Sequence, residues 1–237
     1  METILSTTTK KSPVSLRLLM GLIVIELLLL LRWLLPTVFT PITWDSTLWA
    51  SEKLAWYLTR SSGAVAYIIL SASTVWGLLL STKVIKEWVP GAVALTMHET
   101  LSWLAAGLAA FHALVLLFDH YYTYTLSNLL IPFTGPYEPL WVGLGTLAFY
   151  LLLLLSATFY ARHWIGARRW RQLHYLTFGV YGLTTLHGWL AGTDSAAFGW
   201  LYGTSAFVVI FLTIYRVITA LDSAHTLPQP KRQSAPR

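Results

Sequence analysis

Long apolar stretches separated by short polar segments dominate the pattern of this chain. A helix needs about 20 mostly apolar residues to cross the hydrocarbon core of a membrane. Six stretches meet that requirement, and they run over residues 16–35, 61–81, 92–118, 140–160, 172–191 and 197–219. The sequence therefore predicts an all-α membrane protein whose six transmembrane helices form one bundle.

Composition supports a membrane protein and excludes several kinds of site. Charged residues make up only 11% of the 237 residues, whereas soluble domains carry about a quarter. The chain has no cysteine, which excludes disulfides, iron–sulfur clusters, thiolate–zinc sites and thioether-linked haem. The net charge of +6 follows from residues placed around the spans, so we expect the lipid bilayer and no nucleic acid as a partner.

The distribution of Lys and Arg predicts the orientation in the membrane. With the N-terminus in the cytoplasm, only Arg32, Lys53 and Arg60 of the sixteen basic residues lie outside. Such a bias is the positive-inside pattern, and six spans return the C-terminus to the cytoplasm. We expect a multi-pass protein of the cytoplasmic membrane, with cytoplasmic tails over 1–15 and 220–237 and the bundle over 16–219.

Four of the seven histidines lie inside predicted spans. His98 and His112 belong to span 92–118, and His174 and His187 belong to span 172–191. Spacings of fourteen and thirteen residues correspond to rises of about 21 and 19.5 Å along a helix. Both spans run outward, so His98 is level with His174 (the inner pair) and His112 with His187 (the outer pair).

Paired imidazoles on two facing helices are typical of the axial ligands of a six-coordinate haem iron. Zinc needs ligands close together rather than pairs about 20 Å apart. A proton relay normally includes intramembrane carboxylates near its histidines. Hydrogen bonding within the bundle is the remaining alternative for each ring.

The angle about the helix axis between the two histidines of a span suits a straight helix in span 92–118 but not in span 172–191. Over fourteen residues, a helix rotates to within about 40° of a whole number of turns, so His98 and His112 share a face. Thirteen residues leave about 140° between His174 and His187 in a straight helix. We expect a distortion between them, which Gly179 and Gly182 would ease.

The chain resembles the ferric-reductase-like transmembrane domain of ferric reductases, NADPH oxidases and the haem subunit that serves periplasmic methionine sulfoxide reductase. The resemblance covers about residues 56 to 219. It is carried by the four histidines, by Thr59-Arg60-Ser61-Ser62-Gly63, and by a Gly-x-x-x-Trp-x-x-x-His segment from Gly166 through Trp170 to His174.

The resemblance implies two b-type haems, with His98 and His174 holding the inner one and His112 and His187 the outer one. It implies electron transfer from the cytoplasmic to the outer face. Only about eighteen residues follow the last span, and they contain no Gly-rich dinucleotide fingerprint, so we expect that this chain does not oxidise NAD(P)H by itself. Flavin binding stays open but is not indicated. The expected donor is a separate flavoprotein, a ferredoxin or a quinol, and an acceptor at the outer face completes an oxidoreductase.

Haem propionates need cations near the membrane surface. Arg168, Arg169 and Arg171 are inner candidates and Arg60 is an outer one, although topology or loop ion pairs also account for these residues. Glu26 lies in the middle of span 16–35, where a carboxyl group would contact a partner helix or take part in a proton path.

Two other functions stay open: a cytochrome b subunit of a larger complex, and a proton-coupled transporter that uses the histidines.

Overall fold

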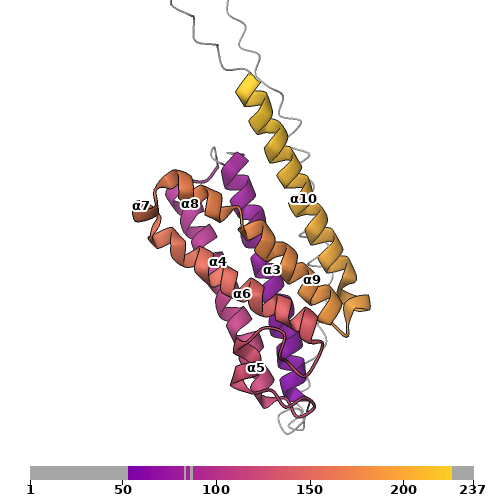
Figure 1. Ribbon diagram of the computed structural model, residues 1–237. Helices are drawn as coiled ribbons and strands as arrows, with labels where there is room; N and C mark the ends of the chain where they lie inside the picture. The colour runs from indigo at the N-terminus through magenta and orange to yellow at the C-terminus, as the bar shows by residue number, and fades with distance from the viewer. Residues whose placement is uncertain (1–52, 83, 86–87, 226–237) are drawn as a thin grey trace, which may run out of the picture. The chain divides into compact units, whose positions relative to one another are not determined.

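The computed structural model describes residues 53–82, 84–85 and 88–225, and these ranges contain helices joined by turns and loops, with no strand (Figure 1). The predicted span 16–35, with Glu26 and Arg32, lies outside the described residues. The helices are α3 (Leu54–Thr82), α4 (Gly91–Val115) with the 3₁₀ turn η1 (Leu116–Phe118), α5 (Leu126–Leu130), α6 (Pro139–Tyr160), α7 (Arg162–Ile165), α8 (Ala167–His174), α9 (Thr177–Ala191) and α10 (Ser195–His225).

Four of the described helices are long and apolar enough to cross a membrane, namely Leu54–Thr82, Gly91–Phe118, Pro139–Tyr160 and Ala196–Asp222. They match four of the predicted spans and support a membrane-embedded, all-helical protein. The first of them begins at Leu54 instead of residue 61, so Thr59 and Arg60 are helical. That the chain crosses the membrane six times stays a prediction.

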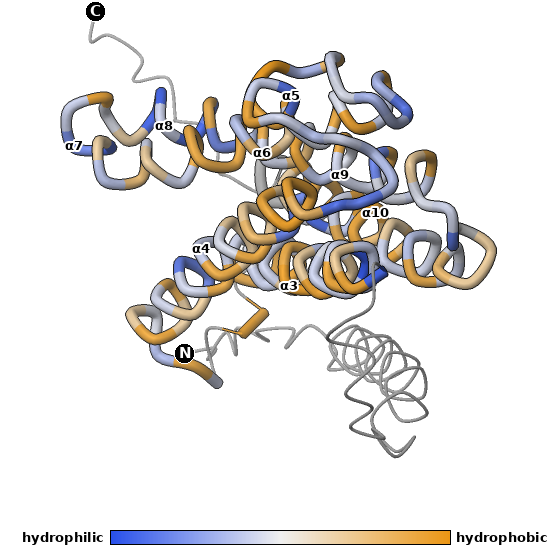
Figure 2. The backbone as a smooth tube through the Cα atoms, turned by 90° about the horizontal axis from the view of Figure 1, so that it is seen from below, coloured by the Kyte–Doolittle hydropathy of each residue, from blue (hydrophilic) through white to orange (hydrophobic). Residues whose placement is uncertain are grey.

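The predicted span 172–191 is not one helix. It is divided between α8, which ends at His174, and α9, which begins at Thr177. With fifteen residues, α9 is about 22 Å long, which is shorter than the hydrocarbon core. Figure 2 shows hydrophilic residues on α8, whereas apolar residues dominate α3.

Helices α3, α4, α6 and α9 pack into one bundle, and α10 packs against α3 and α9 (Figure 1). The centre of the bundle is a cluster of small and branched apolar side chains from all four helices: Leu70, Ala105, Ala106, Leu152, Leu155 and Val180. In α4 and along α8–α9, these residues lie about midway between the two histidines of the same segment. Burial of this layer is favourable because it removes apolar surface from water and fills the bundle closely.

Candidate functional site

The four intramembrane histidines meet in the two predicted pairs. The ring centres of His98 and His174 are 6.1 Å apart, and those of His112 and His187 are also 6.1 Å apart. The ring planes within the two pairs are inclined by 83° and 76°. The matched depths predicted from sequence spacing are therefore confirmed, while the role of these rings as ligands stays a prediction.

The ring spacing fits one metal ion between two imidazoles. Two metal–nitrogen bonds of about 2 Å hold the coordinating nitrogens about 4 Å apart, and the inner half of each ring adds about 1 Å, which gives ring centres about 6 Å apart. Within the described ranges, no group of three or more His, Asp or Glu side chains is placed to hold a metal ion. Each pair supplies two ligands, which is the number that a porphyrin-bound iron takes from a protein.

Backbone carbonyls orient three of the four rings. The Nδ1 of His98 lies 3.0 Å from the Ser73 carbonyl oxygen, that of His112 lies 2.7 Å from Thr59, and that of His187 lies 2.9 Å from Trp141. A carbonyl only accepts, so Nδ1–H donates and each Nε2 keeps its lone pair. Metal-binding histidines commonly have this second contact, because it fixes the tautomer and the ring orientation.

A glycine four residues after each carbonyl makes these contacts possible. Gly63, Gly77 and Gly145 follow Thr59, Ser73 and Trp141 at that spacing. A Cβ atom at these glycines would come within 2.8 Å of His112, 3.0 Å of His98 and 2.8 Å of His187. A helical side chain covers the preceding turn, so its absence lets the ring reach the carbonyl.

The role of these glycines was not predicted from the sequence, although their spacing carries a signal. Gly63 and Gly77 are fourteen residues apart on α3, as His98 and His112 are on α4. The two helices are antiparallel neighbours, so equal spacing brings both glycines level with both rings. Matched Gly and His spacings on consecutive spans indicate this contact once the two helices are known to be neighbours.

The distortion expected between His174 and His187 is present, but it lies closer to His174 than predicted. Gly179 and Gly182 lie inside α9, whereas the helix is interrupted at Tyr175 and Leu176. The Leu176 N–H donates to the Leu173 carbonyl at 3.0 Å, and Phe178 donates to Tyr175 at 3.2 Å. These i→i−3 bonds turn the chain by about 120° per residue, which offsets part of the rotational mismatch.

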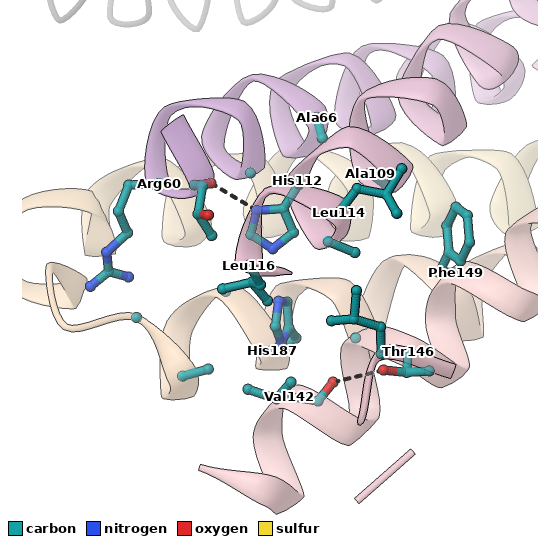
Figure 3. A pocket seen from close by; sticks show the side chains of 18 of the residues that line it. Arg60, Ala66, Ala109, His112, Leu114, Leu116, Val142, Thr146, Phe149 and His187 are labelled. Carbon is teal, nitrogen blue, oxygen red and sulfur yellow. Dashed lines mark hydrogen bonds between the residues drawn. The ribbon is translucent and has the colours of Figure 1, made fainter. Parts of the chain in front are cut away.

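A cavity of about 930 Å³ surrounds the outer pair. Figure 3 shows His112 and His187 approaching each other from two helices, with Arg60 beside them. This volume is at the upper end of the range for large organic ligands. Tyr121, Tyr122 and Tyr124, from the loop before α5, also line it.

Two tyrosines attach the loop between η1 and α6 to the helices. The Tyr137 hydroxyl donates to the Ala191 carbonyl at 3.1 Å, and the Tyr150 hydroxyl donates to the Leu130 carbonyl. Burial raises the pKa of Tyr124 to about 12, so its hydroxyl stays neutral near pH 7. The loop therefore adds neutral aromatic walls to the cavity of the outer pair.

Unpaired buried polar atoms lie on three residues near the two pairs. In the described part of the chain, the buried side-chain atoms without a hydrogen-bond partner are Thr59 Oγ1, Arg60 Nε, Arg60 Nη2 and Trp170 Nε1. Thr59 and Arg60 line the cavity of the outer pair, and Trp170 stacks on His174. Buried polar groups are nearly always paired in native proteins, so these atoms fit a ligand that brings hydrogen-bond acceptors.

Arg60 retains free donors although it has an acidic neighbour. Its Nε lies 3.3 Å from Asp194 Oδ2, which makes an ion pair but leaves Nε without a hydrogen bond of good angle. Its guanidinium carbon lies 5.3 Å from the ring centre of Trp56. A guanidinium held in this way is suited to bind a carboxylate of a cofactor.

The remaining predicted residues take other positions. Arg168, Arg169 and Arg171 are exposed on α8 and do not line the cavity, so their contact with an inner propionate stays a prediction. Tyr181, which lies between His174 and His187 in the sequence, is not among the predicted residues, and its hydroxyl bonds to Ser205 at 2.7 Å and to Tyr67 at 3.1 Å. Tyr181 thus joins α9 to α10 and α3.

Comparison of the chain with protein-family models, with curated proteins and with solved structures gives no match.

Proposed function

We propose that this protein carries electrons across a membrane on two haem b groups, one held by the inner pair and one by the outer pair. The observation that carries the proposal is the repetition of one geometry: two imidazole pairs, each with ring centres 6.1 Å apart, at two depths of one bundle. The proposal also agrees with the resemblance to the ferric-reductase-like transmembrane domain.

The protein's own residues orient ligands, provide counter-charge and exclude water. The Ser73, Thr59 and Trp141 carbonyls fix three imidazoles with Nε2 free to coordinate. Arg60 and Thr59 offer donors to anionic groups in the outer cavity. The iron of a bound haem supplies the one-electron redox chemistry.

The apolar layer at the centre of the bundle lies between the two histidine pairs. Its six residues, from Leu70 to Val180, offer no side-chain group that exchanges protons. A proton relay would have to pass beside this layer, where the hydroxyls of Tyr67, Tyr181 and Ser205 are linked by hydrogen bonds. Electron transfer between two haems needs no polar path, so the layer is compatible with the proposed function.

The proposal includes a direction and partners. Electrons enter at the cytoplasmic face from a separate flavoprotein, a ferredoxin or a quinol, and leave at the outer face to an acceptor. The protein then acts as the membrane component of an oxidoreductase, either alone with its donor or as a cytochrome b subunit of a larger complex.

The test is the haem content of the purified protein, measured by a reduced-minus-oxidised spectrum and a pyridine haemochrome assay. We expect two low-spin haems b per chain. We expect one haem in His98→Ala and one in His187→Ala, whereas His120→Ala and His163→Ala, which change exposed histidines outside the pairs, keep two. A wild-type protein without haem, after expression with ample haem supply, would contradict the proposal.

A further inference from the structure

Trp170 differs from two other indoles in the described part of the chain. Its Nε1–H is buried and has no acceptor. The indole of Trp76 donates to the Ala94 carbonyl at 2.8 Å, and that of Trp103 donates to the Tyr160 hydroxyl at 3.1 Å. An unpaired buried N–H is costly, so the position of Trp170 indicates an acceptor that belongs to a ligand.

Anchoring at the membrane interface does not explain this residue. An interfacial tryptophan keeps its ring in the apolar region and its N–H in the hydrated headgroup region. Trp164, six residues earlier, is 81% exposed and fits that description. The Trp170 Nε1 is buried and has no partner in the described part of the chain, so it is not placed in the hydrated headgroup region.

Trp170 also holds the one histidine that lacks a backbone contact. The ring of His174 has no hydrogen bond to a described residue, unlike the other three rings of the two pairs. Instead, the indole stacks on it with ring centres 5.1 Å apart and planes inclined by 23°. On the α6 side, Phe159 packs against the indole at 6.0 Å and 62°. The Trp170 ring therefore contacts both Phe159 and His174.

We propose that Trp170 is the positioning residue of the inner pair. Its ring plane sets the orientation of the His174 imidazole, and its Nε1–H donates to a carboxylate of the haem held by His98 and His174. This proposal rests on the proposed function. The acceptor follows from chemistry, because the four pyrrole nitrogens bind iron and the propionate carboxylates are then the hydrogen-bond acceptors that haem b offers.

The two parts of this role are separable by substitution. Trp170→Phe keeps an aromatic plane against His174 but removes the N–H donor. Trp170→Leu removes both the donor and the plane. Trp164→Phe is the matched control, because it makes the same change in an exposed indole of the neighbouring helix.

Three measurements on the purified full-length variants test the role. They are the haem count, the midpoint potential of each haem in a redox titration, and the low-spin electron paramagnetic resonance signals, which report the angle between axial imidazole planes. Trp170→Phe should keep both haems and both signals. It should lower one midpoint potential, because the carboxylate loses a donor that spreads its negative charge away from the iron.

A charge-assisted hydrogen bond also contributes to cofactor retention. The haem whose midpoint potential falls in Trp170→Phe should therefore dissociate roughly tenfold faster than the same haem in wild type. Trp170→Leu should in addition shift the signal of the same haem, since His174 is then free to rotate. Trp164→Phe should match wild type in every measurement.

Two haems with unchanged potentials, dissociation rates and signals in both Trp170 variants would overturn the role of Trp170 alone. A wild-type protein that binds no haem would overturn this proposal together with the proposed function. If Trp170→Leu does not fold, Trp170→Phe still decides whether the N–H donates to the haem.

Discussion

Glycines set how closely three of the imidazole rings approach the helices behind them. At Gly63, Gly77 and Gly145, the missing side chain leaves a carbonyl of the preceding turn open to a histidine Nδ1. Histidine orientation is thus encoded on α3 and α6 as much as on the helices that carry the rings. Substitution of one of these glycines should act on its own pair.

Gly145→Ala should weaken the outer site and spare the inner one. The added Cβ would lie 2.8 to 2.9 Å from three atoms of the His187 ring, closer than real Cβ contacts, so the ring must move away from the Trp141 carbonyl. Overpacking of this kind costs about 1–3 kcal/mol, which is enough to displace a ligand. We expect the haem count to fall from two towards one.

The matched control for this change is Gly107→Ala on α4, where an added Cβ meets nothing within 4 Å. That variant should keep two haems, and alanine should even favour the helix slightly. Equal haem counts in Gly145→Ala and wild type would show that His187 does not need its present position.

The histidines were predictable from sequence at the residue scale, and their supporting contacts were not. An imidazole within an apolar span is conspicuous, and the spacings of fourteen and thirteen residues were enough to assign the pairs. Glycine is common in membrane helices, so Gly77 and Gly145 carried no distinctive signal by themselves. Their role depends on which helix lies opposite, which is a property of the fold.

At the scale of elements, the interruption between α8 and α9 lets one chain segment contribute to both pairs. The mismatch of about 140° was visible in the sequence as a conflict between thirteen residues and the helical repeat. Its position was not predictable, because Tyr175 and Leu176 are ordinary helix residues with helical backbone angles. The glycines that looked most deformable, Gly179 and Gly182, are inside α9 and have open space around them.

Insertion of one alanine between Tyr175 and Leu176 should therefore separate the two pairs functionally. One extra helical residue rotates α8 relative to α9 by about 100°, so His174 and His187 can no longer both face α4. Helix α9 contributes to the central apolar layer and α8 has no buried residue, so α9 should keep its place. We expect loss of the inner haem and retention of the outer one in the haemochrome assay.

An alanine inserted directly after Gly166 is the control for that experiment. Gly166 has φ +87° in the turn between α7 and α8, and no atom lies within 4 Å of a Cβ built there. The insertion lengthens a turn without changing the register between α8 and α9. Two haems in both insertion variants would contradict the rotational argument.

For the whole molecule, composition and hydropathy were sufficient to predict a helical membrane bundle, because apolar length is a requirement of the bilayer itself. The same reasoning predicted span 172–191 as one helix, and it did not predict that the short helix α9 begins only at Thr177. Its fifteen residues are fewer than a membrane span usually needs, and the interruption at Tyr175 and Leu176 depends on tertiary packing. The orientation of the bundle rests on the positions of Lys and Arg alone, so it needs a direct test.

The chain contains no cysteine, so single cysteines can report the orientation without background labelling. Tyr121 and Trp164 are suitable positions because they are 87% and 81% exposed and lie near opposite ends of the bundle, in the loop after η1 and in α7. With a membrane-impermeant maleimide, we expect Tyr121→Cys to be labelled in intact spheroplasts. Trp164→Cys should be labelled only after permeabilisation or in inverted vesicles.

The result bears on the proposed function, because the orientation decides which pair would receive electrons first. If labelling is as expected, the inner pair and the exposed arginines of α8 face the cytoplasm, where a soluble flavoprotein or ferredoxin is available. If Trp164→Cys is labelled in intact spheroplasts instead, the cavity of the outer pair faces the cytoplasm. The direction of transfer that we propose would then be reversed, although both histidine pairs and their ligand geometry would be unchanged.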